Sequence, residues 1–214
     1  MIADRPANHP LTHRETVLPG LVVDVRRDEF TFGDEQVTRE YVLHPGAVGI
    51  IALNDLGQML LVEQYRHPVS TVMWEPPAGL LDVADEDPLV AAKRELLEET
   101  GYEAEQWNVL FDFANSPGGS SEQLRCYLAQ GVSQHPDGRP VGDAEERDMP
   151  VHWVPIAEVM EGIAQGRVTH PLLVAGTFAL LTAIADPEVM LRPADAPWHA
   201  RELLLDHDRV RMPR

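Results

Sequence analysis

The stretch at residues 75–102 constrains the fold more than any other part of the chain; it reads EPPAGLLDVADEDPLVAAKRELLEETGY. At the helical period of about 100° per residue, its second half separates into an apolar face and a charged face. The charged face carries an arginine and a group of glutamates, namely Arg94, Glu95, Glu98 and Glu99. The pattern therefore predicts an amphipathic helix that packs its apolar face against a core and turns a cluster of carboxylates away from it.

Both ends of this helix are marked in the sequence. Asp87 is a favourable N-cap residue, and Pro88 suits the first helical position. Gly101 can adopt the left-handed conformation that ends a helix. The glutamates therefore fall in the last turns, where the helix dipole disfavours negative charge.

Carboxylates crowded into so short a stretch do not favour helix stability. Glu95 lies three residues before Glu98 and four before Glu99, and like charges at such spacings repel by roughly a few tenths of a kcal/mol per pair. A bound divalent cation would turn this repulsion into attraction, and hard oxygen ligands suit Mg²⁺ or Mn²⁺. The alternative is an acidic helix face exposed to water, which is the common role of charge runs on helices.

The residues around the glutamates resemble the Nudix box. The family pattern is a glycine, five residues, a glutamate, seven residues, and then Arg-Glu-hydrophobic-X-Glu-Glu-X-Gly-hydrophobic. Gly79, Glu86 and the run at residues 94–102 follow this pattern. The one departure is the loop between Gly79 and Glu86, which holds six residues instead of five, and loops of this kind tolerate insertions.

Motifs outside the box resemble the ADP-ribose pyrophosphatase branch of the family. They are HPGAVGIIAL (44–53), EQYRHPV (63–69), WEPPAGLLD (74–82), SPGGSSE (116–122) and the acidic AEERDMPVHWV (144–154). The resemblance implies metal-dependent hydrolysis of the pyrophosphate bond of ADP-ribose to AMP and ribose 5-phosphate. Two alternatives stay open: a Nudix hydrolase of another nucleoside diphosphate derivative, such as a nucleotide sugar or a dinucleoside polyphosphate, and a non-catalytic Nudix module that binds a nucleotide.

The resemblance also implies which box residues bind the metal ion. Glu95 and Glu99 are the expected ligands, together with the backbone carbonyl of Ala78. Glu98 and Glu86 are the second candidates. The ion is expected to be Mg²⁺, with Mn²⁺ as the alternative.

Further residues have expected catalytic roles. Arg94 is expected to orient the carboxylates by ion pairing. A general base must take the proton of the attacking water. By resemblance this base comes from the late acidic loop, as Glu145 or Glu146, and the sequence does not choose between them.

Four residues outside the box are candidate substrate contacts. Arg66, at a predicted strand end, is expected to pair with a phosphate, and Glu122 to hold a ribose hydroxyl. Trp74 or Phe30 is expected to stack on adenine. The alternatives are a surface ion pair for Arg66, a plain connecting loop around Glu122, and ordinary core packing for the two aromatic residues.

Composition limits the class of protein and its partners. The 214 residues suffice for one sizeable core with a small extra lobe. The net charge of −18, from 35 acidic and 17 basic residues, argues against nucleic acid and anionic membranes as partners. The single cysteine, Cys126, allows no internal disulfide, and residues 1–15 lack the apolar core of a signal peptide. A cytoplasmic protein is therefore expected, and the resemblance implies that its partner is a small nucleotide-diphosphate substrate.

The chain divides into three expected segments: an N-terminal arm and β lobe at 1–43, a main domain at 44–186 and a C-terminal tail at 187–214. Residues 1–15 are predicted to be a loose arm. Strands are predicted at 21–25, 29–32, 36–43, 47–53, 58–64, 107–113, 123–129 and 151–154, and helices at 155–165 and 172–186.

The order of these elements indicates an α+β fold. The resemblance makes the expectation more specific, an α/β/α sandwich with a mixed sheet between helices. The N-terminal antiparallel lobe is too thin to be stable alone. In related dimers this lobe crosses to the partner and completes the adenine site, so a homodimer is expected.

Overall fold

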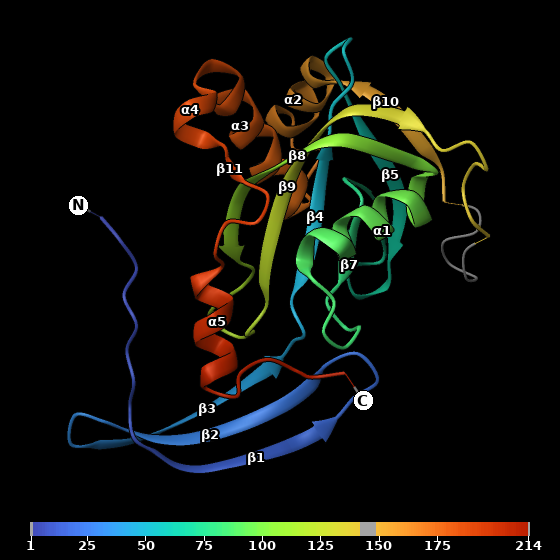
Figure 1. The fold of residues 1–214 in the computed structure, drawn as a ribbon. Helices are drawn as coiled ribbons and strands as arrows, with labels where there is room; N and C mark the ends of the chain where they lie inside the picture. The colour runs from blue at the N-terminus through green and yellow to red at the C-terminus, as the bar shows by residue number, and fades with distance from the viewer. Residues whose placement is uncertain (1, 142–148, 214) are drawn as a thin grey trace.

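Figure 1 shows the protein in a computed structural model, which describes residues 2–141 and 149–213. The main domain has two sheets flanked by helices, and a β lobe lies below it. Within the described residues no helix is both long and apolar enough to cross a membrane.

The larger sheet of the main domain is mixed. In the described residues its strand order is β11-β8-β9-β4-β7. These strands are β4 (Ala47–Ala52), β7 (Ala78–Leu80), β8 (Tyr102–Ala114), β9 (Gln123–Gln134) and β11 (Arg192–Pro193). β4 is parallel to β9, and the other neighbouring strands are antiparallel. Every residue of β4 is buried, as expected of a strand that is covered on both faces.

The smaller sheet is antiparallel and has the order β10-β5-β6. It consists of β5 (Gln58–Arg66), β6 (Thr71–Glu75) and β10 (Val151–Pro155). A short 3-10 turn, His67–Val69, connects β5 to β6.

Helices cover both sides of the sheets. α1 (Pro88–Thr100) lies on one side, and α2 (Ile156–Ala164) and α3 (Pro171–Ala185) lie on the other (Figure 1). The core is divided in the same way. One cluster of buried side chains includes Leu96 of α1, and the other includes Leu172 and Leu180 of α3. This arrangement confirms the predicted α/β/α sandwich with a mixed sheet.

The helix α1 begins and ends where the sequence predicts. The Asp87 carboxylate accepts a hydrogen bond from the Leu89 amide at 2.8 Å. Gly101 has φ 77° and its N–H donates to the Leu97 carbonyl. A residue without a Cβ adopts this left-handed conformation without strain, which explains the glycine at this position.

The N-terminal lobe differs from its prediction. Its antiparallel strands are β1 (Leu11–Pro19), β2 (Asp24–Phe32) and β3 (Glu35–Leu43). The arm predicted at 1–15 is therefore strand from residue 11. The two strands predicted at 21–25 and 29–32 are one continuous strand, β2, which begins only at Asp24. Nearly all side chains of β1 are exposed, so the strand carries no alternating apolar pattern, and backbone pairing with β2 holds it. The turn between β1 and β2 is fixed by the Asp24 carboxylate, which accepts from the Gly20 amide at 3.0 Å.

The segment predicted as a C-terminal tail is folded onto the rest of the protein. It forms α4 (Pro187–Met190), β11 and α5 (His199–Asp206). Trp198 belongs to the core cluster on the α1 side, and its ring lies 4.9 Å and 5.6 Å from the guanidinium carbons of Arg125 and Arg201. Cation–π contacts of this kind stabilise a partly desolvated arginine.

Residues 207–211, here called the C-terminal clasp, tie the main domain to the lobe. Asp28 of β2 is 1 % exposed and receives two hydrogen bonds from Arg14, at 2.8 Å and 2.9 Å. Arg209 of the clasp lies 3.3 Å from the same carboxylate, and Arg211 lies 3.5 Å from Asp24. The lobe is therefore held by buried charges that both ends of the chain supply.

The pKa of Asp28 reflects these contacts. Burial raises it, but the hydrogen bond and charge of Arg14, with the charge of Arg209, outweigh burial and lower the pKa below its ordinary 3.8. A lowered folded-state pKa means that this stabilisation is fully present above pH 3.8 and is lost as the pH falls through the lowered value.

We expect Asp28→Asn to lower the free energy of unfolding by on the order of 3 kcal/mol, because it removes the charge of a buried carboxylate that pairs with the partly exposed Arg14 and Arg209. Asp208→Asn is the matched control. Its side chain is 70 % exposed although it also contacts Arg14 and Arg26, so its loss should cost less than about 1 kcal/mol. Urea unfolding followed by circular dichroism measures both, and equal losses would contradict the role of Asp28.

Candidate active site

Glu99 is enclosed at the junction of α1 and the larger sheet. The residue is 4 % exposed, and its Oε2 accepts a hydrogen bond from the Ala78 amide at 3.0 Å. Ala78 begins β7 opposite Gly49 of β4, and the preceding carbonyl, that of Pro77, accepts from the Ile50 amide at 2.8 Å. The structure thus brings Glu99 and Ala78 together, but through the amide of Ala78 and not through the carbonyl that is expected to bind metal.

Gly79 makes room for Glu95. A Cβ atom at Gly79 would lie 2.0 Å from Cδ of Glu95 and 2.1 Å from its Oε1. Such distances are far below van der Waals contact. The glycine of the box pattern is therefore required by the close approach of the Glu95 carboxylate to β7.

Arg94 lies at the centre of the other box carboxylates. Its Nε and Nη2 donate to the two oxygens of Glu86, both at 2.9 Å. Its Nη1 donates to Glu95 at 2.7 Å and to Glu98 at 2.9 Å. The hydrogen bond from Arg94 is the main cause that lowers the pKa of Glu86. These contacts are the ones that the predicted orienting role of Arg94 requires.

The box residues have the chemistry of a metal site but not its geometry. Carboxylate oxygens are the donors that Mg²⁺ and Mn²⁺ prefer. Nevertheless, nowhere in residues 2–141 and 149–213 do three acidic, histidine or cysteine side chains converge closely enough to hold a metal ion. The guanidinium of Arg94 and the Ala78 amide already engage the carboxylates.

Arg66 lies within electrostatic reach of this cluster. Its guanidinium makes two hydrogen bonds to Glu75, at 2.9 Å and 2.6 Å, and this contact is the main cause that raises the pKa of Arg66. The charges of Glu99 and Glu122 raise it further. The charges of Glu99 and Glu122 thus both act on Arg66. Sequence reasoning missed Glu75, which the pairing of β5 with β6 places on the same face as Arg66.

Glu122 ends the SPGGSSE loop. It accepts from the Asn115 side-chain amide at 2.8 Å and lies 3.9 Å from Nε2 of His44. Burial lowers the pKa of His44, and the nearby charge of Glu122 only partly opposes this shift. The loop is docked on the lobe, because the Ser121 amide donates to the Val42 carbonyl at 2.9 Å.

Trp74 lies away from the box carboxylates. Successive residues of a strand point to opposite faces, so Trp74 faces away from its neighbour Glu75. It packs on the core cluster at the α2–α3 side, and its ring centroid is 4.9 Å from that of His152. It also lines a separate cavity of about 230 Å³. These contacts fit core packing, the alternative to adenine stacking, for Trp74.

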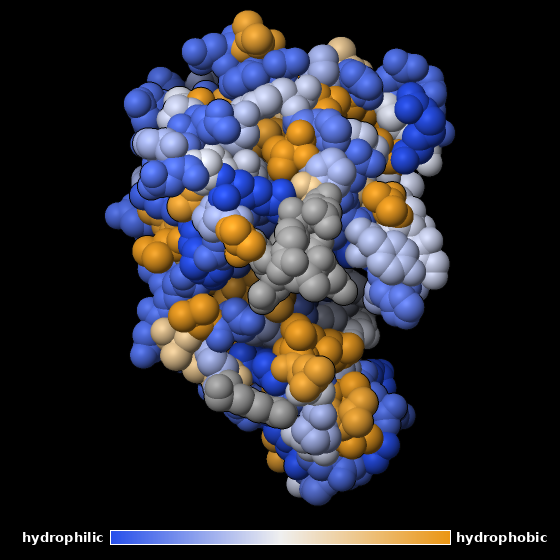
Figure 2. Space-filling view, turned by 90° about the vertical axis from the view of Figure 1, so that its right-hand side faces the viewer, coloured by the Kyte–Doolittle hydropathy of each residue, from blue (hydrophilic) through white to orange (hydrophobic). Residues whose placement is uncertain are grey.

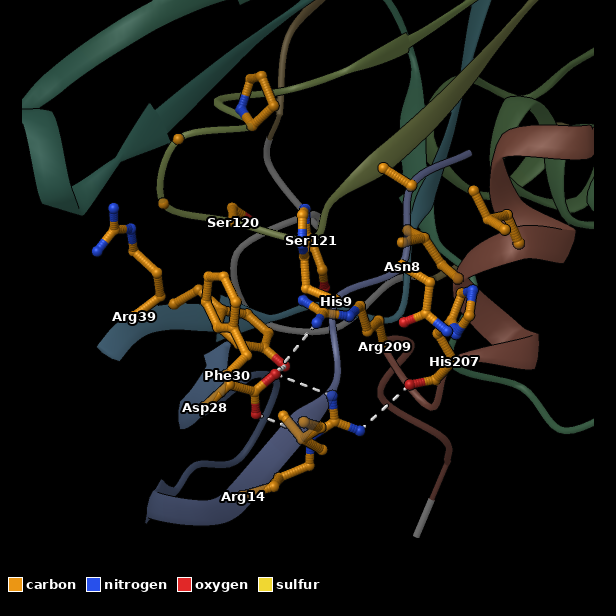
Figure 3. A pocket seen from close by; sticks show the side chains of 18 of the residues that line it. Asn8, His9, Arg14, Asp28, Phe30, Arg39, Ser120, Ser121, His207 and Arg209 are labelled. Atoms are coloured by element: carbon orange, nitrogen blue, oxygen red, sulfur yellow. Dashed lines mark hydrogen bonds and ion pairs between the residues drawn. The ribbon is translucent and has the colours of Figure 1, made fainter. Parts of the chain in front are cut away.

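Phe30 lines a larger cavity of about 640 Å³ between the lobe, the loop around Ser120 and α5. Figure 3 shows Phe30 beside Asp28 and Arg14, with Ser120 and Ser121 across the cavity. None of the described contacts joins Phe30 to the box carboxylates.

The two candidate bases, Glu145 and Glu146, lie outside the described residues. Arg139, just before that segment, donates through Nε to the Glu98 carbonyl at 3.2 Å and through Nη1 to the Met149 carbonyl at 2.8 Å. The chain therefore returns from the acidic loop close to the C-terminal end of α1. Sequence reasoning did not identify Arg139, because its partners are backbone carbonyls far away in the chain.

We expect Gly79→Ala to weaken metal binding by at least about tenfold, since the new Cβ must displace the Glu95 carboxylate. The unfolding temperature should also fall, because Cγ of Glu95 would lie only 2.3 Å from the new Cβ and would have to move with the carboxylate. Gly49→Ala is the matched contrast on the facing strand: its Cβ would lie 2.4 Å from Cδ2 of Leu172, so stability should fall while metal affinity is retained. Titration with Mn²⁺ and thermal unfolding test both, and unchanged metal affinity in Gly79→Ala would contradict this role.

Comparison with known proteins agrees with these observations. The NUDIX domain model matches residues 43–172. The chain is 43% identical over 188 residues to an "ADP-ribose pyrophosphatase" of Mycobacterium tuberculosis, covering 86% of this chain and 88% of the relative. It is 41% identical over 136 residues to a "Methanol dehydrogenase activator" of Bacillus methanolicus, covering 63% and 73%.

A solved structure supports the fold. The structure titled "Crystal structure of ADP compounds hydrolase" superposes with a TM-score of 0.71 at 22% identity, covering 87% of this chain and 99% of that one. The similarity to the Mycobacterium tuberculosis relative confirms the resemblance to the ADP-ribose pyrophosphatase branch. The domain model matches residues 43–172, and the Mycobacterium tuberculosis relative is 43% identical over 88% of its own length. The chain therefore belongs to the NUDIX family.

Proposed function

We propose that this protein is a metal-dependent hydrolase that cleaves the pyrophosphate bond of ADP-ribose to AMP and ribose 5-phosphate. The observation that carries the proposal is the grouping of box carboxylates around Arg94 beside β7, with Arg66 in electrostatic reach of Glu99. The name of the Mycobacterium tuberculosis relative supports the choice of substrate. An acidic protein with a charge of −18 needs such local cations to bind an anionic substrate.

The proposed cofactor is Mg²⁺, with Mn²⁺ as the alternative. Glu95, Glu99 and the Ala78 carbonyl would hold it, with Glu98 and Glu86 as the second candidates. A bound ion of this kind neutralises phosphate oxygens and lowers the pKa of bound water. Until metal binds, Arg94 offsets the negative charge of the carboxylates that surround it.

The chain's own residues have separate proposed roles. Arg66 binds a phosphate oxygen through the part of its guanidinium that Glu75 leaves open, and its side chain is 41% exposed. Glu122 accepts a hydrogen bond from a ribose hydroxyl. Glu145 or Glu146 takes the proton of the attacking water. Phe30 is the better candidate for stacking on adenine, because Trp74 is packed against the α2–α3 core.

We also propose a cytoplasmic homodimer in which the lobe of one subunit completes the adenine site of the other. The lobe exposes a set of large apolar side chains: Val17, Leu18, Leu21, Val22 and Phe32. Figure 2 shows apolar groups gathered on the lower part of one face, where the lobe meets the main domain, while much of the remaining face is hydrophilic. Neither a nucleic acid nor a membrane is a proposed partner.

The dimer has a direct test. Leu21 is 98% exposed, so Leu21→Asp should not disturb the folded subunit, but it should place a charge in the subunit interface. Light scattering should then show a monomer, and hydrolysis should fall with dissociation. A fully active monomer would overturn the proposed shared site.

The proposed activity is tested by incubating ADP-ribose with the protein and Mg²⁺ and identifying the products. AMP and ribose 5-phosphate are expected, and Glu99→Gln should lose at least about a hundredfold in rate because it weakens metal binding. Removal of metal with EDTA should abolish the activity. Cleavage of nucleotide sugars or dinucleoside polyphosphates instead of ADP-ribose would support the alternative substrate class, and an equally fast Glu99→Gln would contradict the assignment of the metal site.

The same assay identifies the base. Whichever of Glu145→Gln and Glu146→Gln removes the base should lower kcat by roughly 10²–10⁴-fold, and the other should have a much smaller effect. Normal rates in both variants would exclude this loop as the source of the base.

A further inference from the structure

The Glu75 side chain is buried beneath Arg66. Glu75 is 1 % exposed, and each of its carboxylate oxygens accepts one hydrogen bond from the guanidinium, at 2.9 Å from Nε and 2.6 Å from Nη2. A two-point contact between a planar guanidinium and a carboxylate fixes orientation as well as distance. Arg66 is therefore held in one direction, although it stands at the end of β5 and is partly exposed.

His170 reaches the same carboxylate from the other helical layer. It is the residue before α3, and its Nε2 lies 3.3 Å from Oε2 of Glu75. Burial lowers the pKa of His170, although the charge of Glu75 opposes this shift. A neutral imidazole at this distance adds no positive charge that would compete with the guanidinium for Glu75. Its other nitrogen, Nδ1, is buried with no hydrogen-bond partner among the described residues.

The position of Glu75 is coupled to that of the box. Only Pro76 and Pro77 separate Glu75 from Ala78, and proline fixes the backbone angle φ. The Ala78 amide holds Glu99, while the Pro77 carbonyl is bonded to β4. The two prolines thus link Glu75, which holds Arg66, to Ala78, which holds Glu99. The negative charge of Glu99 also raises the pKa of Arg66.

We propose that Glu75 and His170 are positioning residues that hold the Arg66 guanidinium toward a phosphate of the substrate. The proposal rests on the proposed hydrolysis of ADP-ribose. Neither residue touches the substrate: Glu75 acts through Arg66, and His170 acts through Glu75. α3, on the side of the sheet opposite α1, thereby contributes to substrate binding.

Steady-state kinetics with ADP-ribose and Mg²⁺ tests the chain of contacts. Glu75→Gln should raise KM by about tenfold or more, because the amide group of glutamine replaces one acceptor with a donor that faces the guanidinium. The value of kcat should fall much less than KM rises. His170→Ala should raise KM by a smaller factor, and His170→Gln, which keeps an N–H donor, should restore it.

Coupling between the residues distinguishes positioning from general destabilisation. In an Arg66→Ala background, Glu75→Gln and His170→Ala should raise KM no further, because the group that they position is gone. Glu63→Gln is the matched control. Glu63 forms a similar pair with His152 at 3.0 Å, on the face of β5 away from Arg66, and its loss should leave KM unchanged. Additive effects with Arg66→Ala, or an equal rise in KM for Glu63→Gln, would overturn the proposal.

A measurement without substrate separates this inference from the proposed function. In ¹H–¹⁵N spectra the Nε–H of Arg66, assigned by its absence in Arg66→Lys, should exchange slowly with water in the wild type and fast in Glu75→Gln and His170→Ala. An unchanged Arg66 signal in both variants would overturn the positioning role. If the wild-type protein binds Mg²⁺ but does not cleave ADP-ribose, the proposed function fails and the phosphate role of Arg66 fails with it, while the spectra still decide how Arg66 is held.

Discussion

The arrangement of the site depends on how this protein accommodates several negative charges on one end of a helix. The dipole of α1 and the mutual repulsion of the carboxylates both oppose the grouping. Arg94 offsets it by binding Glu86, Glu95 and Glu98 at once. Glu99 instead accepts a hydrogen bond from a backbone amide of β7, a half-buried strand that is paired with β4.

This solution imposes demands on the surrounding residues. β7 must come close to α1, which requires a glycine beside Glu95. The strand must also be fixed in position, and the Pro76–Pro77 spacer with its bond to β4 provides this. Glu75, which binds Arg66, directly precedes the same spacer. One short piece of backbone therefore determines the positions of both the cationic Arg66 and the anionic Glu99.

Both helical layers therefore contribute to the site. α1 supplies the carboxylates directly. α3 packs against the opposite face of the sheet, with Leu172 over Gly49, and its first residues place His170 beside Glu75. His170 thus joins the two helical layers at the edge strand β6. Sites that are supported by helices and strands are placed more precisely than sites on loops.

The sequence predicts the parts of the structure that local patterns determine. The ends of α1 follow from Asp87 and Gly101, and the strong apolar runs of β4 and β5 identify these strands. Fixed spacing in the box identifies Arg94 and its partners. The sequence does not predict β1, because the polar residues of this strand show no periodic pattern. It also does not predict the roles of Glu75 and His170, which meet only because β6 and α3 are adjacent in space.

The C-terminal clasp has a consequence for the order of folding. Arg14 and the backbone of Asp208 are joined although 194 residues separate them in sequence, and contacts of such long range form late. During synthesis, β2 emerges early with its aspartates unpaired by Arg209 and Arg211, which emerge only after the sheets of the main domain. The lobe should therefore dock last, and anything fused close behind Arg211 would lie beside the buried carboxylates that complete this step.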